Sequence, residues 1–317
     1  MRYLKIIVSL VFIFFILKGD VYSCGPEIKR EPIEVITIFC PENFAPLIKE
    51  LRSIFEKKYP RHTIYAPEAS DLENIYDILH FKKIPDVLIL SDDSLIDKFL
   101  SSYIDWYIVF ACDKIVLAFK ENSKYSAVIN EKNWYKIISQ KDVRLGRMSE
   151  KNSSLGYRTL MVLDLACKFY PQFNNLNFLP QNIFSTEKEL NFLLLAGDLD
   201  YIFDYLSSAK KYKFRYITLP AQIDLSSCKF KENYAQAKLN LGGRILKGAP
   251  IHYIITIPNS VMYPERGLKF LKIMFSKEGK EMLKKYKIQI IKPYLEVINK
   301  TSILKDIEEI LKGVENE

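Results

Sequence analysis

The chain has 317 residues, of which 49% are hydrophobic and 26% are charged, and its formal net charge is +8. This composition is typical of a globular protein and excludes disordered chains and multi-span membrane proteins. The length predicts two lobes of about 100–200 residues each. Because the positive charge is spread over Lys-rich turns without interleaved aromatic side chains, we do not expect a nucleic acid as a partner.

The N-terminal segment has the pattern of an export signal. Arg2 and Lys5 precede an apolar run at residues 6–17. As a helix this run would span about 18 Å, well short of the roughly 30 Å hydrocarbon core of a membrane. We therefore predict a cleaved signal peptide at residues 1–23 rather than a transmembrane helix.

Residues 21–24 (Val-Tyr-Ser-Cys) resemble a bacterial lipobox, although a tyrosine is unusual at its position. The pattern predicts that Cys24 is the lipidated N-terminus of the mature chain, held at a membrane by its acyl groups. The alternative is ordinary cleavage near Ser23 with a free Cys24. In both cases we expect an exported protein, periplasmic or on the cell surface, with the Pro-containing residues 24–33 as a tether.

The rest of the chain alternates β-rich runs with amphipathic helical patterns, which is typical of a parallel-sheet α/β fold. Strands are predicted at residues 35–40, 62–66, 86–90, 107–119, 201–203 and 251–257. Helices are predicted at residues 44–55, 72–79, about 131–139, 156–169, 186–196, about 264–275 and about 277–286.

Two of the predicted strands are placed to connect the lobes. The run at residues 107–119 is interrupted at residues 112–114 and is longer than one lobe needs, and the run at 251–257 returns. We therefore predict a first lobe formed by residues 34–110 and 254–317, around a second lobe of residues 111–253. The hinges are expected near Phe110-Ala111 and Tyr253-Ile254.

Four cysteines follow Cys24 in the chain: Cys40, Cys112, Cys167 and Cys228. They show neither C-x-x-C spacing nor paired histidines, which argues against a structural zinc site. An oxidising compartment would permit any of three disulfide pairings or none, and we favour buried free thiols.

Signatures of catalysis are weak. The chain contains no G-x-S-x-G, no G-x-x-x-x-G-K-[ST] and no H-E-x-x-H motif, and its three histidines are scattered (His62, His80 and His252). We therefore expect no enzymatic activity and no cofactor.

Polar residues gather where predicted strands end and helices begin. They lie at residues 40–43, 67–71, 90–92, 152–156 and 204–205. Open α/β sheets bind ligands beyond the carboxyl ends of their strands, where helix N-termini present unpaired N–H groups. Each residue could instead act only as a helix N-cap, but their common position favours a ligand site.

Several segments resemble the tungstate/molybdate-binding proteins of ABC importers. They are residues 105–107 (DWY), 113–118 (DKIVLA), 123–125 (SKY), 133–135 (NWY), 156–163 (GYRTLMVL), 199–205 (LDYIFDY), 219–220 (LP), 223–226 (IDLS) and 248–251 (GAPI). The resemblance runs from about residue 35 to 295. It implies a two-lobed, periplasmic-binding-protein-like (type II) fold with a ligand cleft between the lobes. It also implies a monomer that captures molybdate or tungstate and delivers it to a membrane permease.

The positions that match the family's ligand site depart from its pattern. Where the family has Gly-Ser after the first and second strands, this chain has Glu42-Asn43 and Ser70-Asp71. The serine after the third strand falls at Leu90, with Ser91 next, the loop aspartate falls at Ser153, and the glutamate falls at Asp204. The resemblance thus implies ligand contacts from Asn43, Ser91, Ser153, Ser154, Asp204 and Tyr205, with Asp204 as the candidate ligand of the oxyanion's metal centre.

Glu42 and Asp71 leave two interpretations open. They could point away from the cleft as first-turn charges that favour the helix dipole. If they face the cleft, carboxylates would disfavour an oxyanion, and the ligand could be a cation or an organic solute. A sensor or interaction lipoprotein that keeps the fold without transport is a further alternative.

Overall fold

The computed structural model describes residues 32–171 and 182–315. The predicted signal peptide, Cys24 and all of the tether except its last two residues lie outside this part of the chain. Within it, none of the helices combines the length and apolarity that crossing a membrane requires.

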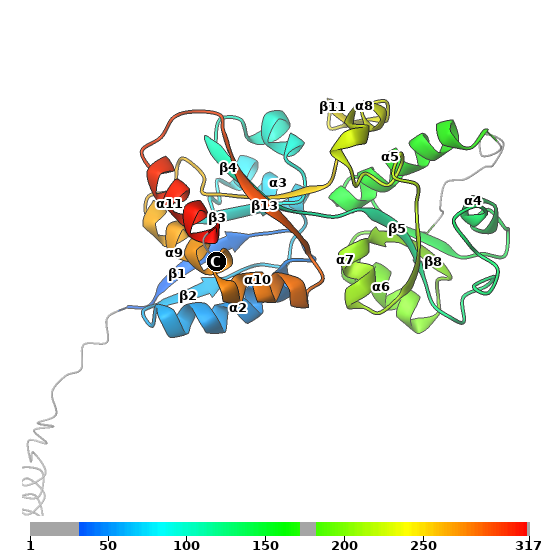
Figure 1. Ribbon diagram of the computed structural model, residues 1–317, viewed down its shortest axis with the longest axis horizontal. Helices are drawn as coiled ribbons and strands as arrows, with labels where there is room; N and C mark the ends of the chain where they lie inside the picture. The colour runs from blue at the N-terminus through cyan, green and yellow to red at the C-terminus, as the bar shows by residue number, and fades with distance from the viewer. Residues whose placement is uncertain (1–31, 172–181, 316–317) are drawn as a thin grey trace, which may run out of the picture. The chain divides into compact units, whose positions relative to one another are not determined.

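The first lobe is built on a six-stranded sheet of order β13-β4-β12-β3-β1-β2. Its strands are β1 (Glu34–Phe39), β2 (His62–Tyr65), β3 (Val87–Leu90), β4 (Trp106–Cys112), β12 (His252–Thr256) and β13 (Gln289–Val297). The helices of this lobe are α2 (Ala45–Lys58), α3 (Asp71–Phe81), α9 (Pro264–Met274), α10 (Lys277–Lys285) and α11 (Leu304–Glu315), with a π-helical turn η1 (Ile96–Leu100). Strands β2, β1 and β3 run parallel, and α2 and α10 pack against each other beside β2 (Figure 1).

The second lobe is built on a five-stranded sheet of order β7-β6-β8-β5-β9. Its strands are β5 (Ile115–Phe119), β6 (Leu145–Met148), β7 (Asn182–Phe184), β8 (Tyr201–Tyr205) and β9 (Arg215–Thr218), and a separate hairpin pairs β10 (Lys238–Leu241) with β11 (Arg244–Lys247). Its helices are α4 (Trp134–Ile137), α5 (Ser154–Phe169), α6 (Glu187–Ala196), α7 (Leu206–Lys211) and α8 (Lys231–Tyr234), with a 3-10 turn η3 (Cys228–Phe230). Figure 1 shows α5 on one side of this sheet and α6 and α7 on the other.

The segment predicted to connect the lobes does so. Strand β4 belongs to the six-stranded sheet through Cys112, and β5 belongs to the five-stranded sheet from Ile115. The chain therefore changes sheets at Asp113-Lys114, inside the interruption seen in the sequence. The lobe boundaries at residues 110/111 and 253/254, and the hinges expected there, stay predictions.

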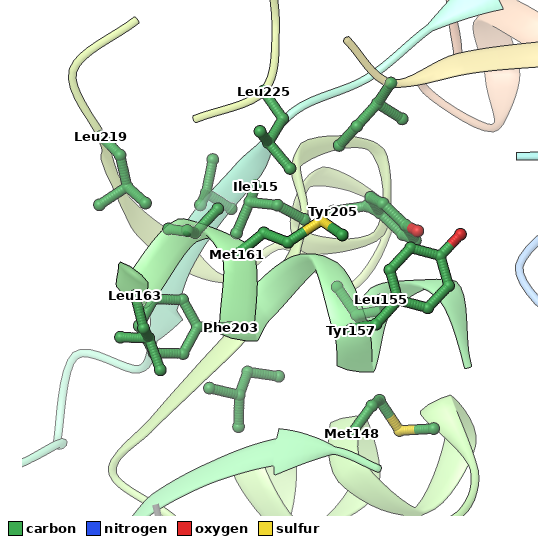
Figure 2. Close-up of a cluster of buried hydrophobic side chains, with 14 of the residues drawn as sticks. Ile115, Met148, Leu155, Tyr157, Met161, Leu163, Phe203, Tyr205, Leu219 and Leu225 are labelled. Carbon is green, nitrogen blue, oxygen red and sulfur yellow. The ribbon is translucent and has the colours of Figure 1, made fainter. Parts of the chain in front are cut away.

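Buried apolar side chains of α5 hold it against the five-stranded sheet. Figure 2 shows Met161 and Leu163 of α5 among Ile115, Phe203 and Leu219, all at most 6% exposed. Burying a side chain of this size contributes about 1.5–3 kcal/mol. This packing fixes the position of the N-terminal end of α5, which carries most of the polar residues described next.

The four described cysteines, Cys40, Cys112, Cys167 and Cys228, are free thiols. The expectation that they are buried holds for Cys40 but is wrong for Cys228, which is exposed in η3. Cys112 and Cys167 are partly buried. Cys228 is exposed because η3 is a 3-10 turn at the surface that buries none of its residues.

Candidate functional site

Three helix N-termini meet between the two sheets. Ser154, the first residue of α5, donates its hydroxyl to Oδ2 of Asp71, the first residue of α3, at 2.8 Å. Ser153, the N-cap of α5, lies 3.4 Å from Oε1 of Glu187, the first residue of α6. Helix N-termini present unpaired N–H groups and the positive end of the helix dipole, so their convergence favours negative charge at this place.

The local sequence determines where each of these helices begins. Ser70 and Glu73 form a complete capping box at the start of α3. Ser153 and Thr186 cap α5 and α6 by accepting a first-turn N–H with their hydroxyls. The N-cap role considered for Ser153 is therefore present, and it leaves its hydroxyl hydrogen free to point toward Glu187.

Asp71 lies at the centre of the converging ends and is 2% exposed. Its Oδ2 accepts hydrogen bonds from the Ser91 hydroxyl at 2.5 Å, the Ser91 N–H at 3.1 Å and the Ser154 hydroxyl at 2.8 Å. Its Oδ1 is buried and has no hydrogen-bond partner among the described residues. The interpretation that Asp71 points away from the cleft is therefore wrong, because its carboxylate joins the two lobes.

A buried guanidinium completes this cluster. Nη1 of Arg158 donates to the Ser91 hydroxyl at 3.1 Å and to the Tyr205 hydroxyl at 3.0 Å, and Nη2 donates to the Ser91 carbonyl at 2.5 Å. Nη2 also lies 3.4 Å from Oδ2 of Asp92, which accepts from the Tyr157 hydroxyl at 2.5 Å. Figure 2 shows the hydroxyls of Tyr157 and Tyr205 directed to the same side of the apolar cluster.

The spacing along α5 explains why one helix supplies so much of the site. Ser154, Tyr157 and Arg158 stand at positions i, i+3 and i+4, which share one face of a helix. The sequence prediction included Ser154 but missed Arg158 and Tyr157. The signal for Arg158 was a charged residue four positions after Ser154, on the same face of the predicted helix.

Glu42 also faces the cleft. Its carboxylate accepts the N–H groups of Glu187 at 3.0 Å and Lys188 at 3.1 Å, so a residue that follows β1 satisfies the N-terminus of α6. Burial raises the pKa of Glu42, and burial beside Glu42 and Asp204 raises the pKa of Glu187 well above its usual range. The raised pKa favours the protonated form of Glu187.

Asp204 lies within β8 and is fully buried. Its Oδ1 accepts the Tyr205 N–H at 2.8 Å, and its Oδ2 has no partner among the residues that the structure describes. Burial raises the pKa of Asp204 to about 7. The strand was predicted to end before Asp204 but runs through Tyr205, because both residues keep their ladder pairs with β5.

A cavity of about 170 Å³ adjoins these residues. Its wall includes Glu42, Asn43, Glu187, Asn191, Ser207 and Lys211. Asn43 donates to the Tyr253 hydroxyl at 2.8 Å, and Tyr253 donates to Asp113 at 3.3 Å. In the described ranges, no group of three His, Cys, Asp or Glu side chains is placed to hold a metal ion.

The structure thus divides the predicted ligand contacts. Ser91, Ser154 and Tyr205 share one hydrogen-bond network with Asp71 and Arg158. Ser153 stands at the edge of this network beside Glu187, Asn43 lines the cavity, and Asp204 is buried with one free oxygen. Their roles as ligand contacts stay predictions.

A family model of bacterial extracellular solute-binding proteins matches residues 36–286. The chain belongs to this family. The resemblance to the tungstate/molybdate-binding members that the sequence indicated is confirmed. The molybdate/tungstate-binding protein WtpA of Pyrococcus abyssi is 29% identical over 297 residues, which cover 84% of this chain and 86% of the relative.

A second relative and one solved structure are also similar to the chain. An uncharacterized solute-binding protein of Petrotoga mobilis is 28% identical over 326 residues, covering 99% of this chain and all of the relative. The solved periplasmic molybdate-binding protein of Azotobacter vinelandii is similar with a TM-score of 0.53 at 14% identity, covering 80% of this chain and 98% of that one. The predicted two-lobed α/β fold is therefore confirmed.

Proposed function

We propose that this solute-binding protein is the exported receptor of an ABC importer and that it binds a small oxyanion, molybdate or tungstate, without catalysing a reaction. The observation that carries the proposal is the meeting of the α3 and α5 N-termini with the Ser91 and Ser154 hydroxyls and the Arg158 guanidinium. Oxyanions are held in proteins by such donors. The name of the Pyrococcus abyssi relative supports molybdate or tungstate as the ligand.

The buried carboxylates favour a second candidate, a cationic or organic solute. Asp71 and Asp204 each keep a buried oxygen without a partner in the described part of the chain. A cation would be attracted to these oxygens, whereas an oxyanion would be repelled wherever they are ionised. The two candidates therefore respond in opposite directions to an added negative charge.

Ser154→Asp is expected to weaken molybdate binding by at least about 100-fold, because it replaces a buried donor by a carboxylate beside Asp71. Isothermal titration calorimetry with molybdate and with a divalent cation would measure both affinities. Ser101→Asp is the matched control, because Ser101 is exposed and lies outside the cluster. The second candidate would be supported if Ser154→Asp left molybdate binding unchanged. It would also be supported if the variant bound the divalent cation more tightly than the wild type without losing affinity for molybdate.

We further propose that Cys24 is acylated and anchors the receptor to the membrane beside its permease, with the folded part acting as a monomer. The proposal rests on the h-region and the lipobox-like residues 21–24. Mass spectrometry of the mature protein is expected to find a diacylglyceryl group on an N-terminal Cys24. An unmodified N-terminus at any other residue would contradict it.

A further inference from the structure

The donors proposed to hold the ligand already hold a carboxyl group of the chain itself. Oδ2 of Asp71 accepts three hydrogen bonds, two from Ser91 and one from Ser154, and Arg158 in turn donates to the Ser91 hydroxyl. We propose that the Asp71 carboxylate is a resident anion that an incoming oxyanion must displace or neutralise, so that binding is coupled to the uptake of one proton. This inference rests on the proposed function and specifies how the same site is regulated.

The oxyanion and the ionised Asp71 carboxylate cannot share these donors, because their negative charges repel each other. An oxyanion that takes the Ser91 and Ser154 hydroxyls would lie in van der Waals range of Asp71, which is 2% exposed and so is poorly screened by water. A proton on Asp71 removes this repulsion. It also converts an acceptor into a donor, since a protonated carboxyl has one O–H to offer.

The proton can bind to Oδ1 of Asp71. Oδ1 is buried and has no partner in the described part of the chain, whereas Oδ2 is already saturated with donors. A proton on Oδ1 would leave the contacts of Oδ2 available for exchange and would give the carboxyl an O–H that can donate to a bound oxyanion. The resident carboxylate would then become one more ligand contact.

Five titratable or charged groups face Asp71 or the Arg158 guanidinium beside it. They are Cys40 after β1, Asp92 after β3, Arg158 on α5, Glu187 on α6 and Tyr205 on β8. Burial raises the pKa of the Cys40 thiol and of the Tyr205 phenol far above neutrality, so both stay protonated. Burial beside Glu42 and Asp204 raises the pKa of Glu187 well above its usual range. Although burial alone would lower it, Tyr205 and Asp92 raise the pKa of the Arg158 guanidinium.

Asp92 is already paired, because Nη2 of Arg158 lies 3.4 Å from its Oδ2 and the Tyr157 hydroxyl donates to the same atom. Asp71 is the acidic group of this set that contacts the Ser91 and Ser154 hydroxyls and keeps a buried oxygen without a partner in the described part of the chain. Burial raises its pKa, and the Ser91 and Ser154 hydrogen bonds and the Arg158 charge oppose that rise. Protonation is favoured as the pH falls, so oxyanion binding should strengthen toward lower pH.

The test is calorimetric titration of the mature protein with molybdate in two buffers of different ionisation enthalpy. The wild type is expected to take up about one proton per molybdate, and its affinity should fall about tenfold per pH unit above neutrality. Asp71→Asn should bind molybdate with no proton uptake and about tenfold or more tightly at about pH 8. Asp71→Ser, which restores the serine expected from the family pattern, should behave in the same way.

Asp86→Asn is the control. Asp86 accepts the Thr37 N–H at 2.8 Å and stands before β3, whereas Ser91 follows it, so its loss should leave both proton uptake and affinity unchanged. Circular dichroism would confirm that each variant is folded. Molybdate binding by the wild type without proton uptake, or unchanged uptake in Asp71→Asn, would overturn the inference and leave the proposed function intact. If neither the wild type nor the folded variants bind molybdate or tungstate, both fail.

Discussion

Replacing Arg158 by methionine is expected to lower the free energy of unfolding by about 3–5 kcal/mol. The guanidinium is the buried partner of Asp92 and donates to the Ser91 carbonyl, and only 3% of its side chain is exposed. Methionine fills a similar volume but leaves the Asp92 charge and the carbonyl without their donor. Urea denaturation measured by circular dichroism would give the difference.

Arg52→Met is the matched control for this substitution. Arg52 forms an ion pair with Glu56 at 2.6 Å, and the two side chains are 52% and 38% exposed. Water can replace the lost contacts, so the expected loss is at most about 1 kcal/mol. Equal losses for the two variants would show that the Arg158 charge is solvated, which would contradict its place in the closed cluster.

Asp204→Asn is expected to stabilise the protein at about pH 8 by on the order of 2–4 kcal/mol. Burial raises the pKa of Asp204 to about 7 from an ordinary value of 3.8. The folded state therefore keeps a proton that the unfolded state has lost, and stability falls as the pH rises from about 4 to about 7. Asparagine has no proton to lose, so this part of the pH dependence should disappear from thermal melts.

Asp200→Asn should change stability in the opposite direction. Although burial alone would raise its pKa, the hydrogen bonds from Arg144 hold the pKa of Asp200 below its usual range. Ionised Asp200 thus stabilises the fold above its unfolded pKa, and asparagine removes that contribution. A stabilising effect of both substitutions would indicate a general response to lower negative charge.

Asp204→Asn should also bind molybdate at least as well as the wild type, because a like charge is removed and a donor is gained.

The sequence predicted the elements that bury a clear apolar pattern. The strands at 35–40 and 86–90 and the helices at 186–196 and 264–275 match β1, β3, α6 and α9 within two residues. Strand β13 was missed, because it is an edge strand with mostly exposed residues and contains Pro293 where its register with β4 shifts. A proline within a run argues against a strand unless the position is an edge or a bulge.

The candidate site was predictable in its location but less so in its contacts. Ser91, Ser154 and Tyr205 were expected near the ligand because they follow strand ends or begin a helix. The direction of Asp71 could not be predicted, because a first-turn aspartate suits either solvent or a cleft and its partner Ser154 is 83 residues away. Arg158 was missed for the same reason, since its acceptors lie on β8 and after β3.

Calorimetric titration of the mature wild-type protein with molybdate and tungstate is the most direct test that this receptor binds an oxyanion. A parallel series with divalent cations completes the measurement. We expect saturable binding of one oxyanion per chain and, at about 100 times the Kd, a gain in stability of about 2.7 kcal/mol. Binding of a divalent cation or an organic solute, with no heat from either oxyanion between about pH 6 and about pH 8, would contradict this expectation.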